Sequence, residues 1–596
     1  MVRSQSWVLR AAALSVTTML VLSACGGTTP TAAPSTGPQP TTSGPQPTVD
    51  NGPKKGGTIY LLSSAEQWNQ VDPQRNYTGE DLAFFSGTLM RELTAYKFSA
   101  DPTEGTSLVA DMATDLGTPS NGGKTWSFTL RDGVTWQDGS DVTCADVKYG
   151  VSRTFATDVI NQGPTYAVAY LDIPSDADGS SSYKGPYGAK AGQDLYDKAV
   201  TCDGKTITFN LKLPVADFNY TVTLGFGAVR ETDDTGETYG TVAPFLISDG
   251  PYMVESYTTG NGGKMILVRN PKWNAASDSV RGAYPDKWEV DFGIDPAVLD
   301  QRIIAASGND AYAIQYGGVQ PENLATLFTD PDNATPEFAG RAISGFDPYS
   351  RYYWIDTTKL KDVKLRQAMA VALDREAIRL NAGGAFAGGF ADGLVKPNIG
   401  GDYAATNFWE SFFGHKIPDK GDPELAKQLI AEASEPMPTL RFNFADTPTN
   451  QRTAAIVIAS FALAGITVTP EPLERGSYYS VVFSDARGHF GTAGWGADWP
   501  NASTVLPPLL TVKGGWDLSQ LDDPGVNAEA DAALTELDRP TQQGLWQALN
   551  KKAAENVYTL PTLFGLSQTI GGTKIGPLYR WAAYGSWPYG AMYVVQ

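Results

Sequence analysis

The sequence predicts an α/β fold divided over more than one domain. At 596 residues the chain is longer than one hydrophobic core normally organises, so we expect two or three domains. Hydrophobic residues make up 42% of the chain and charged residues 18%, which is the composition of a globular protein. Between residues 422 and 500 helical and strand patterns alternate, which is typical of an α/β domain.

The first 24 residues have the pattern of a secretory signal peptide. Arg3 and Arg10 make the start basic, and residues 11–22 are an apolar run too short for a stable membrane anchor. The run ends at Leu22-Ser23-Ala24-Cys25, which resembles the lipobox of bacterial lipoproteins. The resemblance implies cleavage after residue 24 and a lipid on Cys25. The alternative is an ordinary signal peptide with a chance cysteine.

Residues 25–55 are rich in Thr, Pro, Gly and Ser and show no apolar periodicity. Such a segment cannot form a core, so we expect a disordered tether. A Pro-rich tether extends by roughly 3 Å per residue, which would hold the folded region tens of ångströms from the membrane.

Composition limits the classes of function. A net charge of −20 disfavours nucleic acid and broad docking on an anionic membrane. His415 and His489 are the only histidines and lack metal-ligand spacing, so we predict neither a metal site nor a His-based catalytic triad. In an exported, oxidising setting, Cys144 and Cys202 can form a structural disulfide or remain free thiols.

The first elements follow the tether. Residues 59–62 are expected to form a strand, 63–69 the loop that leaves it, and 81–96 a helix with an apolar face. Trp126, Phe128 and Leu130 alternate with polar residues, as in a strand with one buried face.

Helix-capping residues mark the next elements. Thr143 is expected to N-cap a helix, with Asp146 completing a near match to a capping box. Asp362 and Asp422 are expected to cap two later helices, the second of which Pro423 opens. Further helices are expected at 300–307, 456–463 and 528–556. Further strands are expected at 207–211, 265–268, 352–356 and 558–564, the last returning to the first domain, and a turn leading into a strand is expected at 465–468.

The segment Gly494-Trp495-Gly496-Ala497-Asp498-Trp499-Pro500 follows a run that can be a buried strand. Its glycines allow another backbone to approach closely. An Asp between two Trp rings can hold a cation, such as the amino group of a ligand, by a charge-assisted hydrogen bond. The alternative is a strand end whose Trp residues belong to the core and whose Asp caps a turn.

Several separate segments resemble a known family. Residues 130–139 (LRDGVTWQDG) and 142–149 (VTCADVKY) are similar to the signature of the family 5 solute-binding proteins, the extracellular receptors of peptide, nickel and related ABC importers. Residues 364–368 and 372–378 are also close to the family pattern. Cys144 departs from it, which fits a lineage-specific disulfide with Cys202.

The resemblance implies a bilobal, periplasmic-binding-protein-like fold of type II with an extra inserted domain. Two lobes joined by a hinge would close around a ligand. The implied order is a signal peptide (1–24), a lipidated Cys and tether (25–55), a first segment of domain I (56–100), the inserted domain (101–217), a second segment of domain I (218–351), the ligand-binding lobe (352–538) and a return to domain I (539–596).

The resemblance also implies a ligand site. In peptide-binding members, the carboxylate that matches Asp498 pairs with the α-amino group of the ligand. Backbone groups of Gly494 and Gly496 would bond the ligand backbone as a strand does. Trp495 and Trp499 would wall the first side-chain pocket. The opposite lobe would contribute the loop after the first strand, which comprises Ser64, Ala65, Glu66 and Gln67.

Two departures bear on the ligand. Asn501-Ala502-Ser503 stands where many members have a second Asp-Pro, and Thr492 occupies the region of an Arg that some oligopeptide binders use for the ligand carboxylate. These departures weaken a dipeptide assignment and leave room for longer peptides or non-peptides.

The sequence thus favours a lipoprotein that captures di- or oligopeptides outside the cytoplasmic membrane and delivers them to the permease subunits of an ABC importer. We expect a monomer with no cofactor, bound to the membrane through its lipid alone. One alternative is a receptor for an oligosaccharide or another non-peptide solute, which 14 Trp residues permit. The other is a secreted hydrolase with paired carboxylates, which no nucleophile motif or metal set supports.

Overall fold

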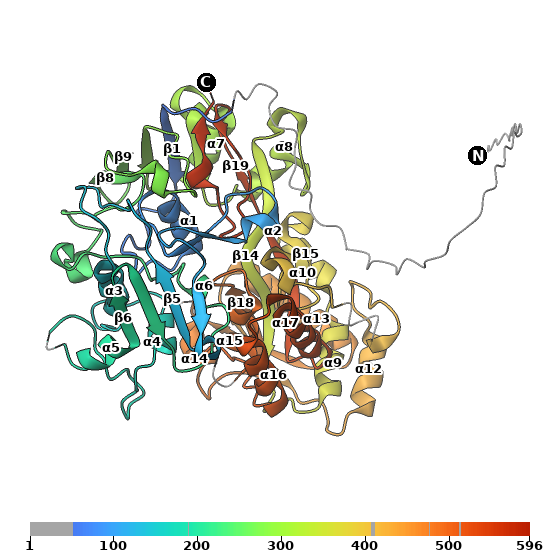
Figure 1. Cartoon of the computed structure of the whole chain (residues 1–596). Coiled ribbons are helices and arrows are strands. Elements are labelled where there is room, and N and C mark those ends of the chain that lie inside the picture. The colour runs from blue at the N-terminus through green and yellow to red at the C-terminus, as the bar shows by residue number, and fades with distance from the viewer. Residues whose placement is uncertain (1–51, 189, 407–411, 476, 512–513, 596) are drawn as a thin grey trace, which may run out of the picture. The chain divides into compact units, whose positions relative to one another are not determined.

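The computed structural model describes residues 52–595 except 189, 407–411, 476 and 512–513. Cys25, the expected signal peptide and most of the expected tether lie outside the described residues. In the region that the structure describes, no helix combines the length and the apolar character needed to cross a membrane. The described strands include three sheets of four or more strands (Figure 1).

The first sheet has five strands in the order β11-β1-β10-β9-β8, in which β1 runs parallel to both neighbours. The strands expected at 59–62 and 265–268 are β1 and β9. The strands of this sheet are β1 (Thr58–Ser63), β8 (Tyr252–Tyr257), β9 (Lys264–Arg269), β10 (Lys287–Asp291) and β11 (Ala313–Tyr316). Helices α1 (Gly79–Thr88) and α7 (Pro296–Ala305) share hydrophobic clusters with this sheet.

The helix expected at 81–96 is shorter than predicted. It ends at Thr88, and residues Thr94–Tyr96 form β2. Between them the backbone N–H groups of Arg91 and Glu92 donate to the carboxylates of Asp249 (2.9 Å) and Asp111 (3.2 Å). These long-range bonds replace the i→i−4 bonds of a helix, which sequence periodicity could not reveal.

The second sheet has four strands in the order β4-β5-β7-β6. They are β4 (Thr118–Ser120), β5 (Thr125–Thr129), β6 (Val200–Asp203) and β7 (Thr206–Asn210). Helix α3 (Cys144–Arg153) begins with the predicted capping box between Thr143 and Asp146. A disulfide joins Cys144 at the start of α3 to Cys202 in β6. Short helices α4 (Tyr166–Tyr170), α5 (Gln193–Ala199) and α6 (Phe218–Thr221) complete this region.

The third sheet has six strands in the order β15-β19-β14-β18-β16-β17. They are β14 (Ala342–Ile355), β15 (Gly388–Phe390), β16 (Leu440–Ala445), β17 (Val468–Leu473), β18 (Phe490–Gly496) and β19 (Thr559–Ile570). Figure 1 shows β14 and β18 close together, with helices of the same region around them. Those helices are α9 (Val363–Ala372), α10 (Arg375–Asn381), α12 (Pro423–Glu432), α13 (Pro448–Leu463), α14 (Tyr478–Val482), α15 (Leu506–Leu510), α16 (Pro524–Thr535) and α17 (Arg539–Glu555).

The predicted caps of this region are confirmed, but two long elements differ from prediction. Asp362 caps α9 and Asp422 caps α12. The helix expected at 528–556 is two helices, because Asp538 caps a new start at α17 with Pro540 in its first turn. The strand expected at 558–564 is longer than predicted, since it forms part of β19 (Thr559–Ile570) and pairs with β14. Its return to the first domain stays a prediction.

The remaining described α-helices and strands are short. They are α2 (Pro102–Gly105), β3 (Leu108–Ala110), α8 (Leu324–Leu327), β12 (Phe328–Asp330), β13 (Asn333–Ala334), β20 (Ile575–Gly576) and β21 (Tyr593–Val594).

Candidate ligand-binding site

Strand β18 has one paired edge and one edge that is mostly open. Its first residue, Phe490, is fully buried and stacks on Phe442 with ring centroids 4.4 Å apart. Strand β14 pairs with β18 along its whole length, from Phe490 to Gly496. On the other side, β16 pairs only with Phe490 and Gly491. From Thr492 to Gly496, therefore, no described strand covers the second edge.

The hydrogen-bond pattern between β14 and β18 alternates along the strand, and it indicates which peptide groups of β18 point to the open edge. The N–H of Asp356 donates to the carbonyl of His489 at 2.8 Å, which places a bonded pair at the start of the ladder. From there, the backbone N–H and C=O groups of every second residue of β18 bond to β14. The residues between them, including Gly494 and Gly496, direct their N–H and C=O groups toward the open edge. The hydroxyl of Tyr478 donates to the carbonyl of Thr492 at 2.6 Å on that side, in agreement.

The carboxylate of Asp498 lies just beyond this strand and is partly buried. The phenol hydroxyl of Tyr166, the first residue of α4, donates to its Oδ2. The hydroxyl of Tyr77, between β1 and α1, interacts with the same carboxylate. Tyr166 and Asp498 are 332 positions apart in the chain, so the site joins segments that no local pattern connects.

Burial leaves this carboxylate with a raised pKa. Desolvation raises the pKa of Asp498 to about 6, while the hydrogen bonds from Tyr166 and Tyr77 act to lower it. Among the residues that the structure describes, no lysine or arginine contributes to the pKa of Asp498. A desolvated carboxylate without a cation is costly in its charged form, so a cationic group brought by a ligand would stabilise it.

The two Trp residues beside Asp498 have different surroundings. Trp499 is only 1% exposed, and its indole N–H donates to Asp217 at 2.8 Å. Its ring centroid lies 4.6 Å from that of Tyr166, so Trp499 supports the tyrosine that holds Asp498. Trp495 is partly buried, and its ring centroid lies 5.4 Å from that of Trp516. Trp495 is therefore better placed than Trp499 to face a ligand. The role of both in a pocket wall stays a prediction.

The loop expected to face the ligand from the opposite lobe bonds to its own sheet region. The residues Ser64, Ala65, Glu66 and Gln67 are exposed. The carbonyls of Ala65 and Glu66 accept from Gly293 (2.9 Å) and Gly260 (2.7 Å). Among the described contacts none links this loop to Asp498, so its role stays a prediction. The tyrosines that do reach Asp498 were not found from the sequence.

A cavity of about 520 Å³ lies beside β18 and β14. Gly494, Arg351 and Thr492 line it from the sheet, and Thr449, Asn450 and Thr453 line it from the first two turns of α13. Arg475, which precedes α14, completes the rim. The cavity thus begins where the open edge of β18 passes Gly494.

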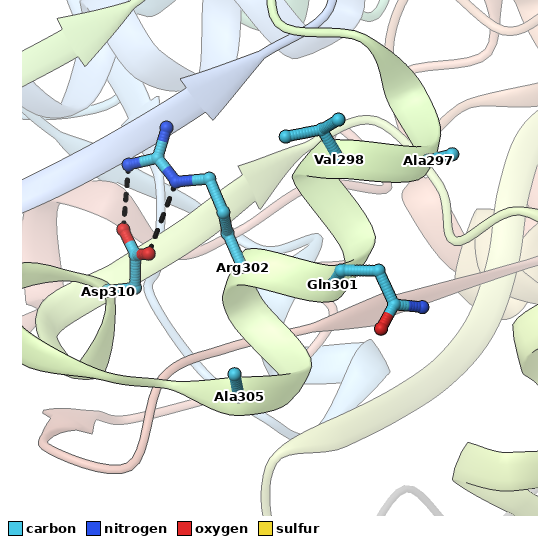
Figure 2. A pocket seen from close by; sticks show the side chains of 6 residues that line it. All are labelled: Ala297, Val298, Gln301, Arg302, Ala305 and Asp310. Atoms are coloured by element: carbon cyan, nitrogen blue, oxygen red, sulfur yellow. Dashed lines mark hydrogen bonds and ion pairs between the residues drawn. The ribbon is translucent and has the colours of Figure 1, made fainter.

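A second hollow, on α7, has a different character (Figure 2). Arg302 and Asp310, which line it, form a bidentate ion pair at 2.7 and 3.1 Å, as the dashed lines in Figure 2 mark. The other lining residues are Ala297, Val298, Gln301 and Ala305. None of the residues predicted to bind ligand borders this hollow. Among the described residues no group of three or more His, Cys, Asp or Glu could hold a metal ion.

Comparison with known proteins identifies the family. The profile of the bacterial extracellular solute-binding proteins, family 5 (middle region), matches residues 107–517, which include the second sheet, Tyr166 and the Asp498 segment. The chain belongs to this family. The fold is accordingly the α/β, bilobal fold of periplasmic binding proteins.

Curated relatives of the chain are named for different ligands. Heme-binding protein A of Haemophilus influenzae is 27% identical over 287 residues, 46% of this chain and 48% of that protein. The dipeptide-binding protein of Escherichia coli is 25% identical over 381 residues, 60% of this chain and 62% of that protein. The chain therefore spans about half to three fifths of the length of these relatives.

Solved structures match over a larger share of the chain. The clavulanic acid biosynthesis oligopeptide binding protein 2 is 28% identical, has a TM-score of 0.79, and the match covers 92% of this chain and 97% of that one. DppA from Helicobacter pylori, solved in complex with the peptide STSA, is 17% identical with a TM-score of 0.60, over 91% of this chain and 99% of that one. The second likeness concerns the fold alone.

Proposed function

We propose that this solute-binding protein captures short peptides by their free α-amino group outside the cytoplasmic membrane and delivers them, chemically unchanged, to an ABC permease. The observation that carries the proposal is the carboxylate of Asp498. It is partly buried, bonded by Tyr166 and without a cationic partner among the described residues. An ammonium group fits such a carboxylate by charge and by hydrogen bonding.

The strand that leads to Asp498 supports a peptide rather than a lone amine. Gly494 and Gly496 direct their peptide groups to an open edge, where an extended ligand can pair as an added strand. Relatives named as dipeptide- and oligopeptide-binding proteins agree with this proposal. The same account includes a lipid on Cys25 as the anchor to the outer face of the membrane.

Calorimetry on a single substitution tests the amine anchor. Asp498→Asn keeps the shape of the side chain but removes its charge, so binding of trialanine should weaken by a factor of about 100 or more. N-acetyl-trialanine, which lacks the ammonium group, should bind weakly to the unsubstituted protein as well. Asp158→Asn is the control, because Asp158 is exposed and lies outside the site.

Equal binding of trialanine by the Asp498→Asn and Asp158→Asn proteins would refute the amine anchor. Native mass spectrometry of protein purified from its own host provides an independent check. A co-purified oligosaccharide would establish the non-peptide alternative instead.

A further inference from the structure

We propose that a small cavity beside the buried carboxylate of Glu92 binds one monovalent cation of the size of Na⁺, which stabilises the folded protein. Glu92 lies between α1 and β2, where the helix predicted from the sequence has already ended. The inference does not depend on which solute the protein carries. Its evidence is an unpartnered carboxylate oxygen, the oxygen atoms around the cavity and the charge balance of the region.

The carboxylate of Glu92 is buried but incompletely bonded. Glu92 is 8% exposed, and its backbone N–H donates to Asp111. Among the residues that the structure describes, no hydrogen-bond donor reaches Oε2 of its side chain. A buried carboxylate without a partner is costly in its charged form, so a positive occupant next to it would stabilise the protein.

The cavity that Glu92 lines has room for one small particle. Its volume is about 10 Å³, roughly the space that a single particle of the size of water needs. Segments far apart in the chain border it, namely α1, β2, the residues after α6 and the C-terminal part of the chain. The hydroxyl groups in its lining belong to Ser86, Thr94, Tyr96, Thr223 and Tyr584.

Three of these hydroxyl groups donate their protons away from the cavity. Thr94 donates to the carbonyl of Asn219 at 2.7 Å. Thr223 donates to the carbonyl of Tyr220 at 2.8 Å. Because the proton of Thr223 is used there, the hydroxyl of Tyr96 is the donor in the 3.2 Å bond between Tyr96 and Thr223. Thr94 and Tyr96 therefore offer lone pairs, and no proton, to an occupant.

The other polar side chains of the lining also have partners. Ser86 donates to the carbonyl of Ala83 at 3.4 Å, and the hydroxyl of Tyr584 interacts with Ser86. The indole N–H of Trp581 donates to the carbonyl of Lys97 at 2.9 Å. The cavity is thus richer in acceptors than in free donors.

Arg281 lines the cavity as well but has no donor left for Glu92. A guanidinium has five N–H groups. Those of Arg281 donate to the carbonyls of Ser86 and Met90, twice to Asp111 and once to Asp278. The nearest positive side chain in the lining is therefore fully occupied by other acceptors.

The charges around Arg281 balance without Glu92. Arg91 and Arg281 both pair with Asp111 and with Asp278, so two positive groups match two negative ones. Asp249 accepts from the backbone N–H of Arg91 and adds a further carboxylate, not a cation. The region therefore has no positive charge to spare for the carboxylate of Glu92.

This chemistry selects a hard, singly charged cation. Carboxylate and hydroxyl oxygens are the ligands that such cations prefer. One uncompensated carboxylate matches one positive charge, and the described residues contain no group of three or more His, Cys, Asp or Glu that would suit a metal of higher charge. Na⁺ is smaller than a water molecule, so it fits a space that barely holds one water.

Thermal unfolding at constant ionic strength tests the proposal. The Tm of the unsubstituted protein should be higher by about 1 °C or more in 200 mM (roughly physiological or above) NaCl than in choline chloride, because choline is too large for the cavity. Glu92→Gln keeps the shape of the side chain and removes its charge, so the difference should disappear. Glu255→Gln is the matched control, since Glu255 is exposed in β8, and it should keep the difference.

The comparison of the two variants isolates the cavity, because either cation acting elsewhere on the protein would affect both variants equally. A crystal structure of the unsubstituted protein grown in NaCl gives a second readout that needs no variant. Oxygen contacts of about 2.3–2.6 Å to an atom beside Oε2 of Glu92 would identify the cation, whereas contacts of about 2.7–3.0 Å would identify a water. A water alone in the cavity, or the same NaCl dependence in Glu92→Gln and Glu255→Gln, would overturn the proposal.

Discussion

If Asp498 anchors the ligand ammonium as proposed, peptide binding should depend on the protonation state of this carboxyl. Burial raises the pKa of this carboxyl to about 6, and a ligand ammonium pairs only with its ionised form. Below about pH 6 the proton must leave before the pair can form. Affinity for trialanine should therefore be highest near about pH 7 and should fall about tenfold for each pH unit well below about 6. It should also decline above about pH 8, where the α-amino group of the ligand loses its proton.

Calorimetry between about pH 4.5 and pH 8 at fixed ionic strength checks this expectation. Because trialanine keeps its ammonium group protonated below about pH 7, a loss of affinity there reports on the protein and on the ligand carboxylate. The amide of trialanine removes the second contribution. A flat profile for the amide between about pH 5 and pH 7 would contradict the assigned role of Asp498.

The phenol of Tyr166 should tune this titration. Its hydroxyl donates to Asp498 and so lowers the pKa of the carboxyl. In Tyr166→Phe the ring can still pack on Trp499 but the donor is lost, so the midpoint of the pH profile should move to higher pH. Affinity at about pH 8 should change less than affinity at about pH 6. A midpoint that stays in place or falls would show that the hydroxyl is not a significant donor.

At the same scale, Asp498 could be selected as a candidate from the sequence, but its partners Tyr166 and Tyr77 could not. An Asp between two Trp residues and close to two glycines is a local pattern, so inspection of that segment alone can find it. Tyr166 lies 332 positions away and Tyr77 comes from the segment before α1. Tertiary packing brings both tyrosines to Asp498, and no residue spacing within a single sequence predicts these contacts.

At the scale of elements, the glycines of β18 have distinct roles. A Cβ on Gly491 would lie 2.6 Å from the carbonyl oxygen of Asn443 and 2.6 Å from the ring of Trp354, whereas the nearest atom to a Cβ on Gly494 would be the carbonyl oxygen of Ser350 at 3.8 Å. Gly491→Ala should therefore destabilise the fold by about 1–3 kcal/mol through overpacking. Gly494→Ala should leave the free energy of unfolding nearly unchanged.

Urea unfolding of both variants measures this difference. The comparison is matched, since both changes add one methyl group to the same strand three positions apart. Equal stability of the two variants would mean that β16 is not packed against β18 at Gly491 as described. Greater loss in Gly494→Ala would contradict the room for a Cβ at Gly494.

Elements with strong local signals were predictable, and those defined by distant partners were not. The caps at Thr143, Asp362 and Asp422 were predicted because a capping side chain bonds to a backbone within its own first turn. The end of α1 was not, because distant carboxylates of Asp111 and Asp249 hold the backbone that follows. Likewise, β19 pairs with β14, and the residues of β19 alone do not predict this partner.

At the scale of the whole molecule, Asp217 connects segments from different regions of the chain. It lies between β7 and α6, is buried, and accepts hydrogen bonds from the indole of Trp499 at 2.8 Å and from the hydroxyl of Ser503. The neighbouring N–H of Ala216 donates to the carbonyl of Leu534 at 3.1 Å. Residues that follow the second sheet are thus bonded to the segment that comes directly after Asp498 and to the end of α16.

These bonds should control how long a ligand stays bound. In a fold that holds its ligand by hinge closure, contacts made across the closed form slow reopening. Asp217→Asn keeps the side-chain volume but replaces a charged acceptor by a neutral amide, which cannot accept as strongly from both Trp499 and Ser503. The loss of one such bond is worth about 1.5 kcal/mol, so the dissociation rate of trialanine should rise roughly tenfold while the association rate changes little. Stopped-flow tryptophan fluorescence measures both rates, and a dissociation rate within about twofold of the unsubstituted protein would show that the Asp217 bonds do not hold the site closed.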